Sequence, residues 1–230
     1  MPPTAKKETF VCFANSRKLN GRCIAGLRWD GTKCSTWIRP ISALEHGELI
    51  HERFYSDGKD PELLDIIELG LLSPRIKGCH TEDVLVAPGD TWTRRGSITF
   101  REALAFVSKP VGPLWFNGKS TYHGENDSIP AKEAHKLGSS LILIRPKSLT
   151  LTCTDEGYQG KMKKKVRGSF TWGKHDYKLS VTDPVIEAEF ATLDVGKIRD
   201  VEAPILCVSV GEKFDKQNAH YKLIAGVLED

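Results

Sequence analysis

Residues 10–42 read FVCFANSRKLNGRCIAGLRWDGTKCSTWIRPIS, and this stretch decides the fold. It opens with a short apolar segment at 10–13 and continues through a polar, basic turn at 15–21. A second strand-like segment runs from 22 to 29, and a third reaches Pro40 after a glycine-containing turn. Short β-prone runs separated by turn residues predict an antiparallel meander of the kind that small barrels contain.

The first turn of this meander concentrates polar and cationic side chains. Arg17, Lys18 and Arg22 lie close together, and Asn15 and Ser16 directly precede them. Cations attract phosphate, while amide and hydroxyl groups can hydrogen-bond to phosphate or base edges. A capped surface turn, in which Asn15 and Ser16 bond to the local backbone, explains the same residues. Both interpretations stay open on the sequence alone.

The third strand carries Trp37 and Arg39, which strand alternation places on one face, with Ile38 on the other. An exposed Trp–Arg face can stack a base, and such stacking is worth about 1–3 kcal/mol per base. The alternative is a core tryptophan beside an arginine that pairs with a carboxylate such as Asp65.

The second half of the chain contains a dense basic run. Residues 161–167 read KMKKKVR. Its five cations are Lys161, Lys163, Lys164, Lys165 and Arg167. Such a run attracts phosphate and should make binding depend on salt concentration. The competing interpretation is the solvated tip of a β-hairpin.

The composition is that of an ordinary globular protein. Hydrophobic residues make up 40% of the 230 residues, enough to bury a core without disulfides. The net charge of +3 permits an anionic partner but does not require one, so the placement of cations matters more than their total. No apolar run approaches the roughly 20 residues that span a bilayer, and no signal peptide is recognisable. We therefore expect a cytoplasmic protein without membrane contact.

The cysteines and polar clusters give little support for a metal site or for catalysis. The six cysteines are scattered, without a Cys-x-x-Cys pair, which indicates free thiols in a reducing compartment and no structural zinc. Polar clusters at 80–83 and 123–127 could supply a general base or a metal ligand, but neither has a recognised spacing. We expect no cofactor, no metal and a non-catalytic role.

Local signals beyond the meander indicate short helices and one long loop. Capping boxes at 42–45 and 99–102 and an Asp183-Pro184 cap each predict the start of a short helix. A long irregular stretch at 110–127 contains several aromatic residues, and such loops are usually functional or connect domains.

Short motifs throughout the chain carry a family resemblance. They are residues 12–18, 21–26, 37–42, 61–66, 82–83, 177–184, 208–214 and 221–223. These motifs resemble those of prokaryotic proteins with a dual OB-fold-containing domain. The resemblance implies two OB-like barrels and a role with nucleic acids, with a weaker association with prokaryotic antiviral defence. It implies no catalytic residues.

We therefore expect a mainly β, β-rich α+β protein in which two small OB-like barrels lie side by side with a few short helices. The N-terminal barrel, at 8–127, ends in the long loop, and the C-terminal barrel occupies 138–230. The expected function is a module that binds single-stranded DNA or RNA within a nucleic-acid-processing or defence system. The alternatives are a scaffold that docks a larger effector protein through residues 113–123, and an enzyme that acts on nucleotides or nucleic acid.

Overall fold

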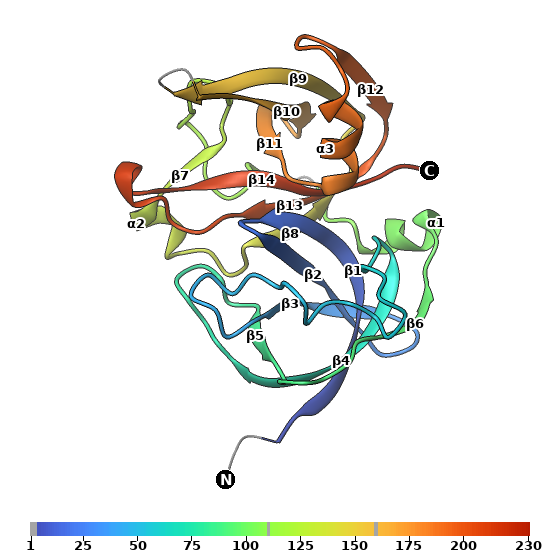
Figure 1. Cartoon of the computed structure of the whole chain (residues 1–230). Helices are drawn as coiled ribbons and strands as arrows, with labels where there is room; N and C mark the ends of the chain where they lie inside the picture. The colour runs from blue at the N-terminus through green and yellow to red at the C-terminus, as the bar shows by residue number, and fades with distance from the viewer. Residues whose placement is uncertain (1–3, 110, 159–160) are drawn as a thin grey trace. The chain divides into compact units, whose positions relative to one another are not determined.

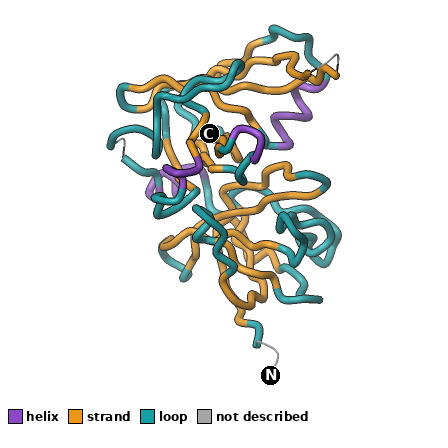
Figure 2. The backbone as a smooth tube through the Cα atoms, turned by 90° about the vertical axis from the view of Figure 1, so that its left-hand side faces the viewer, coloured by secondary structure: helices purple, strands orange, loops and turns teal. Residues whose placement is uncertain are grey.

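The computed structural model describes residues 4–109, 111–158 and 161–230. The chain divides into two compact units, Met1–Phe106 and Val107–Asp230. Both consist mainly of strands, with a few short helices (Figure 2). The mainly β fold expected from the sequence is confirmed. By this division residues 111–127, part of the long loop expected at the end of the N-terminal barrel, fall within the second unit.

The first unit contains a closed five-stranded barrel (Figure 1). Its strands follow the order β1-β2-β3-β5-β4, and β4 pairs back with β1. β3 and β5 run parallel, and the other neighbours in the barrel run antiparallel. The predicted meander is confirmed as β1–β3. The strands are β1 (Lys6–Lys18), β2 (Gly21–Trp29), β3 (Cys34–Ile41), β4 (Asp65–Pro74) and β5 (Asp83–Val86), and β6 (Thr93–Ser97) pairs with β4.

A glycine on β2 allows β1 and β2 to approach each other closely in the barrel. A Cβ atom on Gly26 would lie 1.9 Å from the carbonyl oxygen of Val11, so no larger residue fits there without movement of the backbone. Phe10, Ile24 and Ile38 come from three successive strands and meet in the core, each with no exposed surface. Burial is continuous over the middle of β1 and β2 and at the end of β3, so both faces of these strands are covered there.

The two capping boxes behave differently. At Thr99 the box forms, since Thr99 and Glu102 exchange hydrogen bonds and begin α1 (Phe100–Ala103), which the 3-10 turn η1 (Leu104–Phe106) follows. At Ser42 no helix forms, so that prediction is wrong. The Ser42 hydroxyl accepts from the Leu44 amide, and the Ser42 amide donates to Gly47, which closes a tight turn instead.

The second unit repeats the strand path of the first around an open sheet. β9, β10 and β11 form an antiparallel meander, β11 runs parallel to β14, and β14 pairs with β13. β12 and β8 lie at the two ends of the sheet, and β7 pairs with β14. The strands are β7 (Ser128–Pro130), β8 (Leu141–Ile144), β9 (Ser148–Tyr158), β10 (Lys161–Trp172), β11 (His175–Val181), β12 (Ile198–Glu202), β13 (Ile205–Val210) and β14 (Ala219–Leu228).

Three short helical elements complete the second unit. They are α2 (Ala131–Ala134), α3 (Pro184–Ala191) and the 3-10 turn η2 (Asp215–Gln217). The predicted cap of α3 is confirmed, because the Asp183 carboxylate accepts from the Val185 amide at 2.9 Å and Pro184 starts the helix. α3 packs against β10. Among the described residues, no helix has the length and apolar character needed to cross a membrane, and all six cysteines are free thiols.

Candidate nucleic-acid interface

The β1–β2 hairpin gathers three of the predicted cations. Arg17 and Lys18 end β1, and Arg22 lies directly opposite Arg17 in the register of the two strands. Arg17 is exposed, while Lys18 and Arg22 are partly buried. Like charges that face each other across paired strands are unfavourable without nearby anions. Arg22 Nε lies 3.9 Å from the Asp60 carboxylate, and the Lys18 ammonium donates to the carbonyl oxygen of His46.

The two uncharged candidates at this hairpin make contacts within the first unit. Asn15 Nδ2 donates to the carbonyl oxygen of Pro61 at 2.6 Å, and Ser16 is only 6% exposed. At the tip, Leu19 is 60% exposed and takes a left-handed conformation with φ of 49°. The surface of this hairpin therefore consists of cations around an exposed leucine.

Arg39 lies inside the first unit. It is 3% exposed, and its Nε donates to Asp83 Oδ1 at 2.6 Å. The parallel pairing of β3 with β5 places these two residues opposite each other, so Arg39 pairs with Asp83 and not with Asp65. Burial raises the pKa of Asp83, although the neighbouring Arg39 opposes that shift. His80 Nδ1 lies 4.0 Å from the same carboxylate.

Trp37 is half-buried and packs edge-on against Phe13, with ring centroids 6.4 Å apart. Phe106 contacts Phe13 in the same manner. The structure thus places Trp37 in an aromatic cluster and Arg39 in a buried ion pair, and the two do not form a joint exposed face.

The β9–β10 hairpin carries the second basic run. Lys163, Lys164 and Lys165 are exposed, whereas the side chain of Lys161 lies outside the described part of the structure. Lys164 Nζ donates to the Leu193 carbonyl just beyond α3, at 2.7 Å. Lys165 Nζ lies 3.6 Å from the Glu156 carboxylate. Lys163 forms no ion pair or side-chain hydrogen bond with the described residues.

Arg167, the last cation of this run, is buried. It is 7% exposed and donates from Nε and Nη2 to the two carboxylate oxygens of Glu156, at 2.7 and 2.8 Å. Asp127 lies 3.5 Å away on its other side. Burial would raise the pKa of Glu156, but the hydrogen bonds from Arg167 and Thr154 overcome that effect and lower it to about 2. Arg167 is therefore held in a buried ion-pair network inside the second unit.

Each basic run occupies the first hairpin of its unit's meander. This equivalence follows from the shared strand path, in which β9 and β10 correspond to β1 and β2. In OB folds, the loops after the first and the fourth strand flank the surface that binds oligonucleotides. Both basic runs thus lie on strands that flank the first connection of their unit, which corresponds to one of the two loops that border the oligonucleotide-binding surface in OB folds.

The connection between the fourth and fifth strands of each barrel path corresponds to the other loop, and the sequence did not mark it. Between β4 and β5, Arg75 and Lys77 are exposed on either side of Ile76, which is 64% exposed. Between β13 and β14, exposed Lys213 precedes Phe214, which is 45% exposed. No local signal marks these residues, because only the pairing order shows which strands are the fourth and fifth of each path.

The aromatic loop is anchored to the second unit by buried polar groups. The backbone amide of Leu114 and the side-chain amide of Asn117 donate to the Tyr177 hydroxyl at 2.8 and 2.9 Å. Lys222, 1% exposed, donates to Asn117 Oδ1 at 3.0 Å, and burial lowers its pKa to about 7. On the same loop, Tyr122 is 97% exposed.

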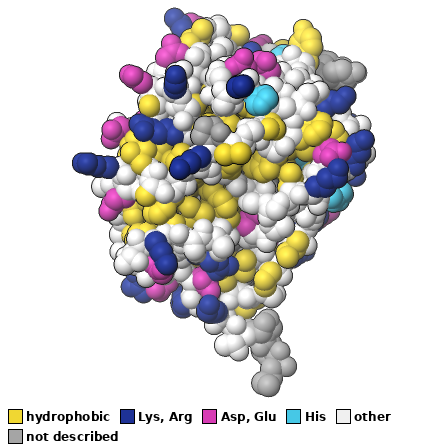
Figure 3. All heavy atoms as spheres, turned by 180° about the vertical axis from the view of Figure 1, so that it is seen from behind, with side chains coloured by type: hydrophobic (Ala, Val, Ile, Leu, Met, Phe, Trp, Pro, Cys, Tyr) yellow, Lys and Arg dark blue, Asp and Glu magenta, His cyan; other side chains and the backbone are white. Residues whose placement is uncertain are grey.

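The two polar clusters differ in burial. Residues 80 and 82–83 are buried beside Arg39, whereas the 123–127 segment is mostly half-buried, with Glu125 exposed and Asp127 buried. Within the described residues, no group of three or more His, Cys, Asp or Glu side chains could hold a metal ion. Acidic and cationic side chains are mixed over the face shown in Figure 3 and do not form one continuous patch of a single charge.

Comparison with known families agrees with this architecture. A family model described as a dual OB-containing domain matches residues 8–227, nearly the whole chain. No curated protein matches the sequence.

Proposed function

The chain belongs to the family of dual OB-containing domains, and on this premise we propose that it binds single-stranded nucleic acid through the hairpins and loops described above. The proposed surface in the first unit consists of the β1–β2 hairpin and the β4–β5 connection. In the second unit it consists of the β9–β10 hairpin and the β13–β14 connection.

One observation carries the proposal: the two dense basic runs, about 140 residues apart in the chain, occupy equivalent hairpins. Cations placed at random on a surface would not recur at the same point of a repeated strand path. A phosphate backbone is the partner that such cations fit, since each neutralised phosphate releases a condensed counterion.

Apolar residues beside these cations favour single strands over duplexes. Leu19, Ile76 and Phe214 are exposed at three of the four loops. An exposed base can pack on such side chains, whereas a base inside a duplex is already stacked on its neighbours. Arg39 and Arg167 do not belong to the proposed surface, because both are buried in ion pairs.

The test is fluorescence anisotropy of labelled single-stranded DNA, single-stranded RNA and duplex DNA at several salt concentrations. The variant Arg17→Glu/Lys163→Glu changes one exposed cation in each basic hairpin. Its matched control, Arg101→Glu/Lys132→Glu, changes one exposed cation per unit away from the hairpins, with the same change in net charge.

We expect the wild type to favour single strands and to weaken steeply with salt. The hairpin variant should bind about tenfold or more weakly, and its salt slope should fall by about 0.7 for each phosphate that the protein no longer neutralises. An equally large effect in the two variants would refute the hairpin assignment. No binding by the wild type at low salt would refute the function.

The resemblance to prokaryotic proteins extends the proposal to a non-catalytic component of a nucleic-acid-processing or defence system in the cytoplasm. A scaffold that docks a larger effector is the second candidate. It is supported by Tyr122, which is 97% exposed on a loop that buried hydrogen bonds hold in place. It predicts a complex that Tyr122→Ala disrupts and that forms without nucleic acid.

A further inference from the structure

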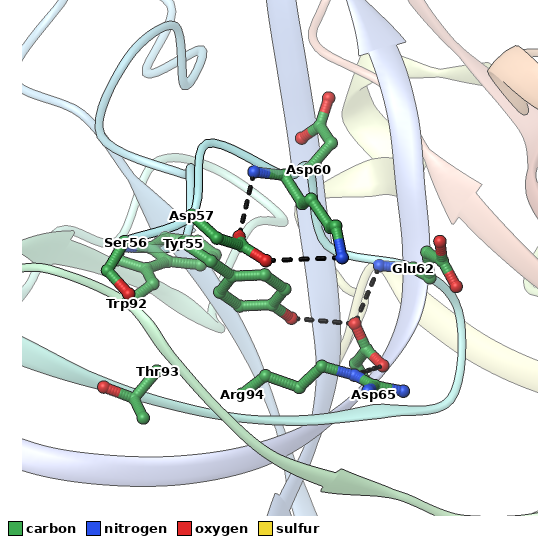
Figure 4. Close-up of a pocket in the computed structure, with 10 residues that line it drawn as sticks. Tyr55, Ser56, Asp57, Asp60, Glu62, Asp65, Trp92, Thr93 and Arg94 are labelled. Carbon is green, nitrogen blue, oxygen red and sulfur yellow. Dashed lines mark hydrogen bonds and ion pairs between the residues drawn. The ribbon is translucent and has the colours of Figure 1, made fainter.

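The first unit contains a polar pocket of about 480 Å³ between residues 55–65 and the start of β6 (Figure 4). Its deepest residues are buried: Tyr55 is 8% exposed, Asp65 2% and Trp92 1%. Exposed Glu62 and Arg94 stand at its edge. The pocket therefore combines buried aromatic side chains with both hydrogen-bond donors and acceptors.

Asp65 organises the pocket. It accepts from the Tyr55 hydroxyl at 2.8 Å, from the Glu62 amide at 3.0 Å and from Arg94 Nε at 2.5 Å (Figure 4). The last of these bonds orients the Arg94 guanidinium and uses only its Nε atom. The two terminal nitrogens of Arg94 have no partner among the described residues, and the side chain is 51% exposed.

Two further polar groups of the pocket are unused. The indole N–H of Trp92 is buried and has no hydrogen-bond partner in the described structure. A buried donor without a partner is costly, and each one in a native structure calls for an explanation. The Glu62 carboxylate forms no ion pair or hydrogen bond with the described residues, although its charge reaches Arg94.

The pocket adjoins the cationic β1–β2 hairpin. Asp60, which lines it, lies 3.9 Å from Arg22 Nε. The next residue, Pro61, accepts from Asn15 Nδ2 at 2.6 Å. A strand whose phosphates lie on this hairpin therefore passes within reach of the pocket.

We propose that this pocket receives a guanine base of the bound single strand, an inference that rests on the proposed function. Guanine presents two acceptors, O6 and N7, which suit the terminal nitrogens of an arginine such as Arg94. It also presents N1–H and an amino group, which suit a carboxylate such as Glu62. None of thymine, cytosine and adenine presents both sets, and bases of single strands are commonly read on such edges.

The test compares a thymine-only oligonucleotide with an alternating thymine–guanine one of equal length, by anisotropy in lithium salt to suppress guanine quadruplexes. Arg94→Gln removes the guanidinium, whose two terminal nitrogens would donate to O6 and N7 of guanine. Arg95→Gln is the matched control, because Arg95 is the next residue, has a similar exposed fraction (54%) and pairs outside the pocket with Glu68. Glu62→Ala removes the carboxylate at an exposed site, with little risk to folding.

We expect the wild type to prefer the guanine-containing strand by at least about fivefold. Arg94→Gln and Glu62→Ala should abolish that preference and retain binding of the thymine-only strand. Arg95→Gln should lower the affinity for both strands by the same factor. The Trp92 indole N–H resonance, assigned with Trp92→Phe, should shift only with guanine. Binding of both strands with equal affinity would overturn the pocket proposal and leave the proposed function intact, while no binding of either strand would overturn both.

Discussion

Replacing Glu156 by Gln should destabilise the second unit because it neutralises one side of a buried ion pair. Glu156 is 4% exposed and accepts two hydrogen bonds from Arg167, at 2.7 and 2.8 Å. Glutamine keeps the shape of the protonated acid but removes its charge. The substitution therefore imitates at pH 7 what acid does to the wild type.

The magnitude follows from the pKa of Glu156, which falls from 4.5 to about 2. At about 1.4 kcal/mol per pKa unit, ionised Glu156 contributes about 3 kcal/mol to the free energy of unfolding. Because the folded-state pKa is lowered, this contribution is fully present above pH 4.5. It disappears as the pH falls toward 2, and only about 1.4 kcal/mol remains at pH 3.

The assay is urea unfolding between pH 7 and pH 3, followed by tryptophan fluorescence, since Trp172 is 5% exposed in the core of the same unit. Asp155→Asn is the matched control, because Asp155 is the exposed neighbour of Glu156 on β9. The control should stay within about 0.5 kcal/mol of the wild type.

A cost of less than about 1 kcal/mol for Glu156→Gln at pH 7 would contradict this prediction. A cost that does not change between pH 7 and pH 3 would contradict it as well. Either result would mean that the charge of Glu156 contributes little to the folded state.

Three other predictions concern stability. Arg39→Met should cost about 3–5 kcal/mol in urea unfolding, because it leaves the Asp83 carboxylate buried without its cation. The double variant Arg39→Met/Asp83→Leu should recover part of that stability, and an equal or larger cost would contradict the ion-pair role. Gly26→Ala should cost about 3 kcal/mol, since its Cβ would lie 1.9 Å from a carbonyl oxygen of β1, and an unchanged melting temperature would contradict the close approach of β1 and β2. Burial lowers the pKa of Lys222 from 10.5 to about 7. Between pH 7 and pH 10.5 the unfolded chain therefore binds more protons than the folded one. The stability of the wild type relative to Lys222→Met should therefore rise from pH 7 to 10.5, by up to about 5 kcal/mol, and a flat difference would show that the ammonium is not desolvated.

The sequence alone determined the features that depend on neighbouring residues. Short β-prone runs and turn residues in 10–42 predicted the first three strands, and Asp183-Pro184 predicted the start of α3. The two basic runs were visible because charge clustering is local. The same locality explains the error at Ser42, where a capping-box pattern lies in a turn that Gly47 closes.

Only the tertiary structure decided which cations are exposed. Alternation assigns Arg39 to a face of its strand but cannot show that parallel pairing brings Asp83, 44 residues away, against it. Arg167 likewise follows three exposed lysines yet is buried between Glu156 and Asp127. The equivalence of the two basic hairpins, and the β4–β5 and β13–β14 loops that complete the proposed surface, depend on pairing between strands far apart in the chain. Such pairing leaves no periodic signal in the sequence, because it is set by which surfaces bury each other when the chain folds.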